Sequence, residues 1–274
     1  RPIVDYMVDE SLKQHLISSA KLTEAEAASL LSYQLEDPTI DESQRMAVVD
    51  ALDSIKIIDP ACGSGAFPMG ILQKMLFILQ KVDPDSQRWF DKKLASIGDA
   101  ALRRDLKAKL KADNFNYVHK LGIIREAIYG VDIQPIAVEI SKLRFFLSLI
   151  VDERVSDDKE NRGIEPLPNL EFKFVCANSL IGLPKNDDQK SFSEATSDIE
   201  ILKSLRDDYL RSYGSEKKRV QKKFLEVQSK MAKHALSWAL WGSEKSQTMK
   251  LSQWDPFAEE PCGWFDPEWM FGIK

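Results

Sequence analysis

Three short stretches of the chain carry residue types that can hold a small polar ligand. Each follows a run of apolar residues that is typical of a buried strand. The stretches are Asp59-Pro60-Ala61-Cys62-Gly63-Ser64-Gly65, Asp132-Ile133 and Asn178-Ser179. Because open α/β sheets bind ligands at the carboxyl ends of their strands, we expect the three stretches to form one site.

The first stretch has the chemistry of a loop that holds a ligand with its backbone. Gly63 and Gly65 lack a Cβ, so the chain can approach a ligand closely and adopt conformations that other residues avoid. A helix is predicted over residues 66–82, and its first turn offers free N–H groups and a partial positive charge. A pair of glycines is a weak signal by itself, and a purely structural turn is the alternative.

The other two stretches add side chains that suit a nucleoside. The carboxylate of Asp132 can accept hydrogen bonds from ribose hydroxyls. Ile133 can lie flat against an adenine, and the Asn178 amide can read a purine edge. The distance in sequence from Asp59 to Asp132 exceeds the roughly 20 residues of a simple strand–helix–strand unit. Residues 83–125 account for the difference, and we expect them to be a helical insertion packed on the outside.

The elements that must position these stretches indicate an α/β fold. Strands are predicted over residues 55–59, 127–132 and 171–176, and helices over 66–82 and 135–152. Strand, glycine turn, helix and strand in this order predict a partial Rossmann-like fold, with a parallel sheet flanked by helices and interrupted by helical insertions.

Four segments are expected along the chain. Residues 1–54 are predicted to be helical, and residues 55–184 form the α/β core with its insertion 83–125. Residues 185–250 are charged and predicted to be helical. Residues 251–274 form an irregular segment whose aromatic side chains we expect to pack over the sheet.

Composition excludes several classes of protein. No run of about 18 apolar residues occurs, so we expect no membrane-spanning helix. The three cysteines form no C-x-x-C pair, so neither zinc nor disulfides are expected, and a cytoplasmic setting fits best. The net charge of −5 does not indicate general nucleic-acid binding. The basic run Lys203–Lys233 could contact DNA phosphates, although a solvated helical face is the favoured interpretation.

The longer strings around these residues resemble one family. Asp59 to Phe67 reads D-P-A-C-G-S-G-A-F, which resembles motif I of N6-adenine-specific DNA methyltransferases of type I and type IIG restriction–modification systems and of phage-exclusion systems. Residues 128–135 resemble the second motif, and residues 167–172 with 176–180 resemble the third. Residues 2–8 look like the end of the motif X helix of the family.

The resemblance implies a cofactor, a partner and residue roles. The cofactor would be S-adenosylmethionine, and Asp59 with the turn Pro60–Gly65 would cradle its methionine portion. Asp132 would hold the ribose hydroxyls, and Ile133 would pack on the adenine. Asn178 with Ser179 would approach the adenine N6. Double-stranded DNA would be the partner of the full-length protein, alongside a specificity subunit or a fused nuclease.

One part of the family pattern is not found. The catalytic loop of the family reads [D/N/S]-P-P-[Y/F/W] and holds a flipped base, but the chain contains no Pro-Pro. We therefore expect that the chain stops before the fourth strand and its loop, so that it binds the methyl donor but does not transfer methyl groups by itself. No catalytic residue and no metal ligand is assigned.

Other functions stay open at this point. The chain could be a non-catalytic module that binds DNA or a partner. It could also belong to a methyltransferase for RNA, protein glutamine or a small molecule, since the same loop chemistry serves other amino groups. Cys62, and Cys262 in the pair Pro261-Cys262, are candidate nucleophiles, but neither has the surroundings that would favour this role.

Overall fold

The structure is a computed structural model, and it describes most of the chain. The described residues are 2–34, 39–86, 88–90, 92, 115–152, 169–183, 193–212, 214–239, 247–258 and 260–273. The predicted helical stripe from Leu94 to Leu110 lies outside the described residues.

Helices and strands alternate in the middle of the chain, as the sequence predicts. The elements are α1 (Pro2–Ser19), α2 (Glu24–Leu31), α3 (Glu42–Ser54), β1 (Ile57–Asp59), α4 (Ala66–Val82), α7 (Phe115–Glu126), β2 (Ile128–Asp132), α8 (Pro135–Ile150), β3 (Phe174–Cys176), α9 (Ser193–Arg211), α10 (Gly214–Ala239), α11 (Gln247–Gln253) and α12 (Pro267–Phe271). None of the described helices is both long and apolar enough to cross a membrane.

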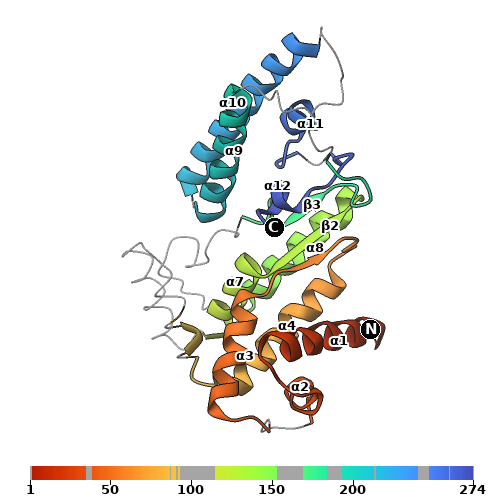
Figure 1. Ribbon diagram of the computed structural model, residues 1–274, viewed down its shortest axis with the longest axis vertical. Helices are drawn as coiled ribbons and strands as arrows, with labels where there is room; N and C mark the ends of the chain where they lie inside the picture. Colours follow the sequence, from red (N-terminus) through yellow and green to blue (C-terminus); the bar gives the residue numbers. More distant parts are fainter. Residues whose placement is uncertain are drawn as a thin grey trace.

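A parallel sheet lies at the centre of the described residues (Figure 1). Its strand order is β1-β2-β3, with Ile57 opposite Ile128 and Gly130 opposite Phe174. The predicted α/β fold, with a parallel sheet flanked by helices, is therefore confirmed. The carboxyl ends of all three strands meet at one edge because every pair is parallel.

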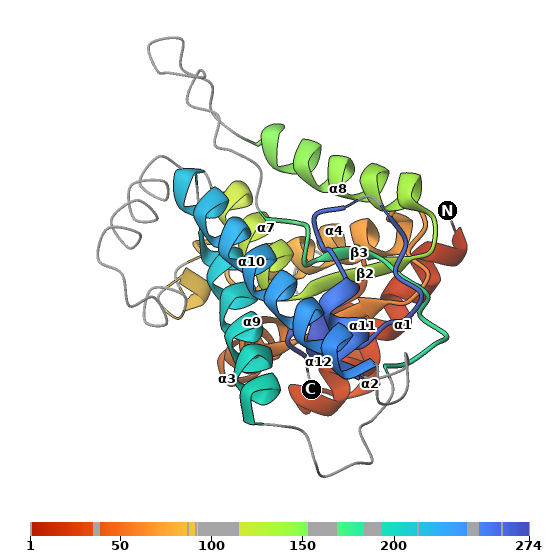
Figure 2. The same cartoon turned by 90° about the horizontal axis from the view of Figure 1, so that it is seen from above.

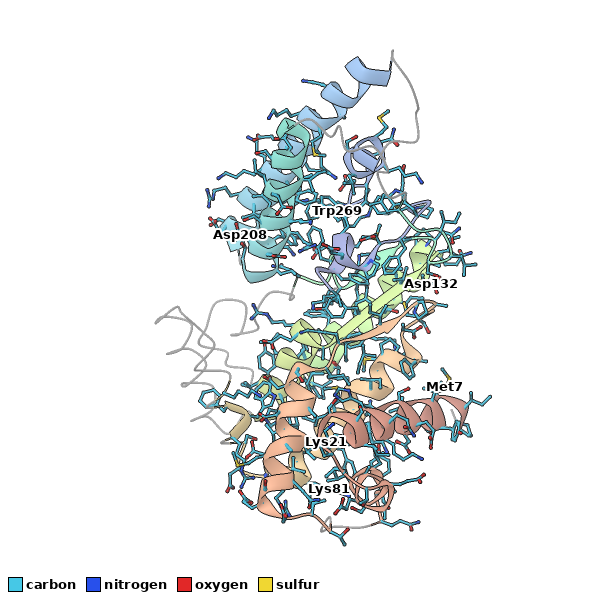
Figure 3. The ribbon with its side chains drawn as sticks, in the orientation of Figure 1. Met7, Lys21, Lys81, Asp132, Asp208 and Trp269 are labelled. Carbon is cyan, nitrogen blue, oxygen red and sulfur yellow. The ribbon has the colours of Figure 1, made fainter. Side chains whose placement is uncertain are left out.

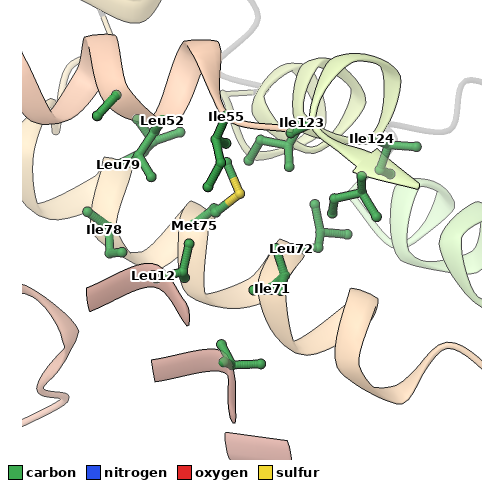
Figure 4. Close-up of a cluster of buried hydrophobic side chains, with 14 of the residues drawn as sticks. Leu12, Leu52, Ile55, Ile71, Leu72, Met75, Ile78, Leu79, Ile123 and Ile124 are labelled. Atoms are coloured by element: carbon green, nitrogen blue, oxygen red, sulfur yellow. The ribbon is translucent and has the colours of Figure 1, made fainter. Parts of the chain in front are cut away.

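The sheet separates two hydrophobic cores. Side chains of a strand alternate between its faces, and in β2 Ile128 belongs to the first core, whereas Tyr129 and Val131 belong to the second. The first core lies under α1, α2, α3, α4, α7 and α8. Figure 4 shows its centre, where Leu12, Leu52, Met75 and Ile124 come together from four helices. All four are at most 2% exposed.

The helix α7 is part of this layer. The sequence indicates an insertion packed on the outside, but the end of that insertion is buried, with Ile124 0% exposed and Val118 3% exposed. The helix contacts α4, α8 and β2. The predicted insertion 83–125 combines the polar residues 83–114 with most of α7. The average composition of this segment is therefore polar, although α7 has an apolar face.

The second core joins two segments that the sequence treats separately. The second core is shared by the charged helices α9 and α10, by α11, and by the aromatic segment that contains α12, together with β2 and β3. The view from above shows α9 and α10 side by side, with α11 and α12 next to them (Figure 2). Trp254, Trp264 and Trp269 are all buried there. The aromatic residues therefore pack over the sheet, as expected.

The strands are shorter than the apolar runs that predict them. Before β3, the backbone N–H groups of Lys173 and Phe174 both donate to the Leu170 carbonyl at 2.9 Å. This turn keeps residues 171 and 172 out of the ladder, which begins where the Lys173 carbonyl accepts the Gly130 N–H at 2.8 Å. The side chains before β3 are buried as well as those in it. The apolar pattern of the sequence therefore does not show at which residue β3 begins to pair with β2.

Replacing Phe172 with Ala should lower the free energy of unfolding by about 3–5 kcal/mol. The ring is fully buried and contacts four other aromatic rings, those of Tyr209, Phe224, Trp254 and Phe257. Urea denaturation measures the loss. The control Met46→Ala, at a side chain that is 57% exposed, should stay within about 0.5 kcal/mol. Similar losses in the two variants would contradict the second core.

Candidate functional site

The glycine turn and the end of β2 are joined by backbone and side-chain hydrogen bonds. Cys62 N–H donates to the Val131 carbonyl at 2.9 Å, and Gly63 N–H donates to Asp132 Oδ2 at 2.8 Å. The first two predicted stretches therefore meet at the carboxyl edge of the sheet. Figure 3 shows Asp132 at this end of β2.

The carboxylate of Asp132 is oriented from both sides. While Oδ2 accepts the Gly63 N–H, Oδ1 accepts the Gln134 N–H at 2.9 Å. A carboxylate has about four acceptor positions, so these two bonds fix its direction and leave capacity for a ligand. The residue is only partly buried, and an acceptor for hydroxyl groups therefore faces the edge of the sheet.

Both glycines of the turn have left-handed backbone conformations. Gly63 has φ +54° and Gly65 has φ +78°, a region that other residues enter at a cost of about 1–2 kcal/mol. Gly65 also caps the start of α4, where its carbonyl accepts the Met69 N–H at 3.0 Å. The turn therefore leads directly into the N-terminus of a helix that is 17 residues long.

The third stretch lies beside the second. Ala177 N–H donates to the Asp132 carbonyl at 2.9 Å, and Asn178 N–H donates to the Cys262 carbonyl at the same distance. The Asn178 side chain is partly used, since its Oδ1 accepts the Leu180 N–H at 3.1 Å. Its amide NH₂ group stays able to donate. Ser179, the next residue, is half-buried on the same loop.

Apolar side chains are exposed at this edge. Ile133 is 53% exposed and Leu180 is 93% exposed. They follow β2 and β3, on loops that the Ala177 to Asp132 bond holds side by side. An exposed isoleucine beside an oriented carboxylate suits a flat, apolar ligand surface with hydroxyl groups at its rim.

Asp59 lies at the start of the turn and is half-buried. Its Oδ1 accepts the Ala61 N–H at 3.1 Å. Burial raises the pKa of the Asp59 carboxyl above its usual value; the Ala61 N–H lowers it, and the negative charge of Asp132 raises it further. Two carboxylates that repel each other at one edge favour a cationic ligand group between them.

The cysteines are not suited to nucleophilic attack. Burial, together with the charges of Asp59 and Asp132, raises the pKa of the Cys62 thiol to about 12. Burial also raises the pKa of Cys262. Since the thiolate is the nucleophile, both fit the structural role that the sequence favours. Among the described residues, no group of three His, Cys, Asp or Glu is placed to hold a metal ion.

Two residues of α8 also contact the turn, although nothing in the sequence around them predicts this contact. Ser141 Oγ donates to the Gly63 carbonyl at 2.9 Å, and Arg144 Nη1 donates to the Ser64 carbonyl at 2.7 Å. The available signal was that these two polar residues lie three positions apart on a largely apolar helix that also carries Glu139, Lys142 and Ser148. That signal does not say what they bind.

The basic run on α10 is partly neutralised within the protein. Lys222 lies 3.9 Å from Glu226, Lys230 lies 3.0 Å from Asp198, and Arg219 pairs with Glu216. Such pairs are typical of a solvated helical face. A role of this face in DNA binding stays a prediction.

Parts of the chain that contain the candidate site are similar in sequence to known proteins. Residues 126–256 match the Eco57I restriction-modification methylase family. The matched region begins just before β2, so it contains Asp132, Ile133, Asn178 and Ser179, whereas the turn Pro60–Gly65 lies outside it.

A curated relative extends the similarity. The chain is 32% identical over 230 residues to a protein of Methanocaldococcus jannaschii that is named as a candidate type II restriction enzyme and methyltransferase. The matched region covers 83% of this chain and 17% of the length of that relative. No solved structure gives a significant match. The chain is thus a distant homologue of restriction-modification methylases.

Substitutions at the two glycines should differ in their effect. At Gly65 a Cβ would lie 2.9 Å from Ser141 Oγ, whereas at Gly63 it would meet nothing within 4 Å. Gly63→Ala should therefore lose about 1–2 kcal/mol of stability from the backbone alone. Gly65→Ala should lose at least about 1 kcal/mol more because of overpacking. Denaturant unfolding of both variants measures the difference, and equal losses would contradict the close contact.

Proposed function

We propose that this chain forms the S-adenosylmethionine-binding part of a DNA methyltransferase that methylates adenine at N6. The observation that carries the proposal is the contact between the Gly63 N–H and the Asp132 carboxylate at 2.8 Å. It joins a glycine turn at a helix N-terminus to an acceptor for ribose hydroxyls, and a nucleoside cofactor with an amino-acid portion needs both.

The residues present fit this cofactor. The space beside Gly63 is open, since a Cβ there would meet nothing within 4 Å. Asp132 directs free acceptor capacity to the same edge, and Ile133 offers an exposed apolar surface for an adenine. The carboxylates of Asp59 and Asp132 supply negative charge for the ammonium and sulfonium groups of the cofactor.

Each residue has a role in binding. When bound, S-adenosylmethionine supplies a methyl group on a positively charged sulfur. Asp59 and the turn Pro60, Ala61, Cys62, Gly63 and Gly65 would hold the methionine portion. Asp132 would bind the ribose, Ile133 would pack on the adenine, and Asn178 with Ser179 would approach the adenine N6. Cys62 acts through its backbone and its small size, because its thiol is buried.

Double-stranded DNA is the proposed substrate of the whole protein. The support is the similarity of residues 126–256 to restriction-modification methylases and the description of the archaeal relative. A specificity subunit or a fused nuclease as a further partner belongs to the same proposal. Assay of radioactive methyl transfer from S-adenosylmethionine to duplex DNA, to RNA and to glutamine peptides by the full-length protein separates these substrates.

Replacing Asp132 with Asn should weaken the binding of S-adenosylmethionine by about tenfold or more, because hydrogen bonds to a charged acceptor contribute about 1.5–3 kcal/mol. The variant keeps one side-chain oxygen and the same shape. Titration calorimetry on the chain and on the variant measures both affinities.

The control for this variant is Glu139→Gln, which removes an exposed carboxylate of α8 that pairs with Lys142 at 2.8 Å. Its affinity should match that of the unchanged chain. Absence of any heat or thermal shift with the unchanged chain at millimolar cofactor would overturn the proposed cofactor role.

Replacing Asp59 with Asn should stabilise the ligand-free chain at neutral pH and weaken the binding of S-adenosylmethionine. Burial raises the pKa of the Asp59 carboxyl in the folded state above its unfolded value. The cost of this group to stability is therefore absent below the unfolded pKa and fully present above the folded pKa. The melting temperature of the variant should therefore exceed that of the unchanged chain at pH 7. The gap should close as the pH falls below the unfolded pKa of Asp59, because the carboxyl of the unchanged chain is then neutral in both the folded and the unfolded state. A gap that does not depend on pH would contradict the electrostatic cause.

A further inference from the structure

Two side chains of α8 hold two successive carbonyls of the glycine turn. Ser141 Oγ donates to the Gly63 carbonyl at 2.9 Å, and Arg144 Nη1 donates to the Ser64 carbonyl at 2.7 Å. Ser141 and Arg144 lie three positions apart, so they are neighbours on one face of the helix. Ser141 is 0% exposed. The turn is therefore bonded to the inner side of α8.

These bonds decide which way the peptide groups of the turn face. A peptide group is planar and trans, so its C=O and N–H point in opposite directions. Because the Gly63 carbonyl faces Ser141, the N–H of Ser64 faces away from α8. The neighbouring N–H groups have acceptors, since Gly63 donates to Asp132 at 2.8 Å and Gly65 donates to the Cys62 carbonyl at 2.8 Å.

The Ser64 N–H is left for a ligand. In the part of the chain that the structure describes, no acceptor takes this N–H. Ser64 itself is exposed, and the space beside Gly63 is open. A free N–H that precedes a helix N-terminus is a site for an anionic group. The methionine carboxylate is the anionic group of S-adenosylmethionine.

We propose that Ser141 and Arg144 are positioning residues that aim the Ser64 N–H at the methionine carboxylate of the cofactor. This inference rests on the proposed function. It gives α8 a role in binding only the amino-acid portion of the cofactor, because the ribose is bound by Asp132. The guanidinium of Arg144 also places a positive charge beside the same loop, which favours a carboxylate there.

The first experiment needs no cofactor. Hydrogen exchange of the backbone amides of residues 61–66 is compared between the chain, Ser141→Ala and Arg144→Gln. Loss of either bond should speed exchange about tenfold. The control is Ser148→Ala, because Ser148 Oγ bonds the Phe145 carbonyl of the same helix at 2.7 Å. Unchanged exchange in both variants would overturn the inference that α8 holds the turn.

The second experiment separates the two ends of the cofactor. Calorimetry with S-adenosylhomocysteine and with 5′-methylthioadenosine, which lacks the amino-acid portion, is done on the same variants. Ser141→Ala and Arg144→Gln should weaken S-adenosylhomocysteine by about tenfold and leave 5′-methylthioadenosine unchanged. Arg144→Lys should restore part of the loss, since it keeps the charge. Asp132→Asn should weaken both ligands.

The outcomes are distinguishable. Equal weakening of both ligands by Ser141→Ala would show general damage to the fold and overturn the positioning role. Unchanged affinity for both ligands would overturn it as well. If the unchanged chain binds neither ligand, the proposed function fails and the cofactor role of α8 fails with it. In that case hydrogen exchange still decides whether α8 holds the turn.

Discussion

The hydrogen bond from Gly63 N–H to the Asp132 carboxylate is the contact on which the candidate site depends. It joins residues that are 69 positions apart in the chain, and it does so at the carboxyl edge of the sheet, where the loops after all three parallel strands lie together. The parallel order β1-β2-β3 makes the contact possible. Without that bond the glycine turn would be a helix cap and Asp132 would be a surface carboxylate.

The two cores support this edge from opposite sides. The first core fixes α4 and α8, so the turn and the residues that bond to it share one rigid layer. The second core, built from α9 to α12 and the buried tryptophans, covers the other face of β2 and β3. It also reaches the third loop, because Cys262 N–H donates to the Cys176 carbonyl and the Cys262 carbonyl accepts the Asn178 N–H. An aromatic segment that is distant in sequence therefore helps to place Asn178.

Sequence patterns predicted the parts of this arrangement that depend on local chemistry. The run Ile57-Ile58-Asp59 before two glycines indicates a strand and a ligand-holding turn, and Asp132 follows the next apolar run in the same way. Contacts between side chains of distant elements were not predictable. Ser141 and Arg144 look like ordinary polar residues of a helix, because the carbonyls that they bind lie 78 and 80 positions away in the chain. The packing of α9 and α10 with the tryptophans was hidden for the same reason, since their charge suggests solvent on every side.

The fit between Gly65 and Ser141 has an evolutionary consequence. Ser141 Cβ lies 3.3 Å from the position that a Cβ on residue 65 would occupy, so the backbone of the turn and the inner face of α8 leave no room between them. Any descendant that keeps the turn must keep a small side chain at position 141. Sequence divergence along α8 is thereby directed to its outer face, where Ile136, Leu143 and Leu147 are exposed and can change without disturbing the loop.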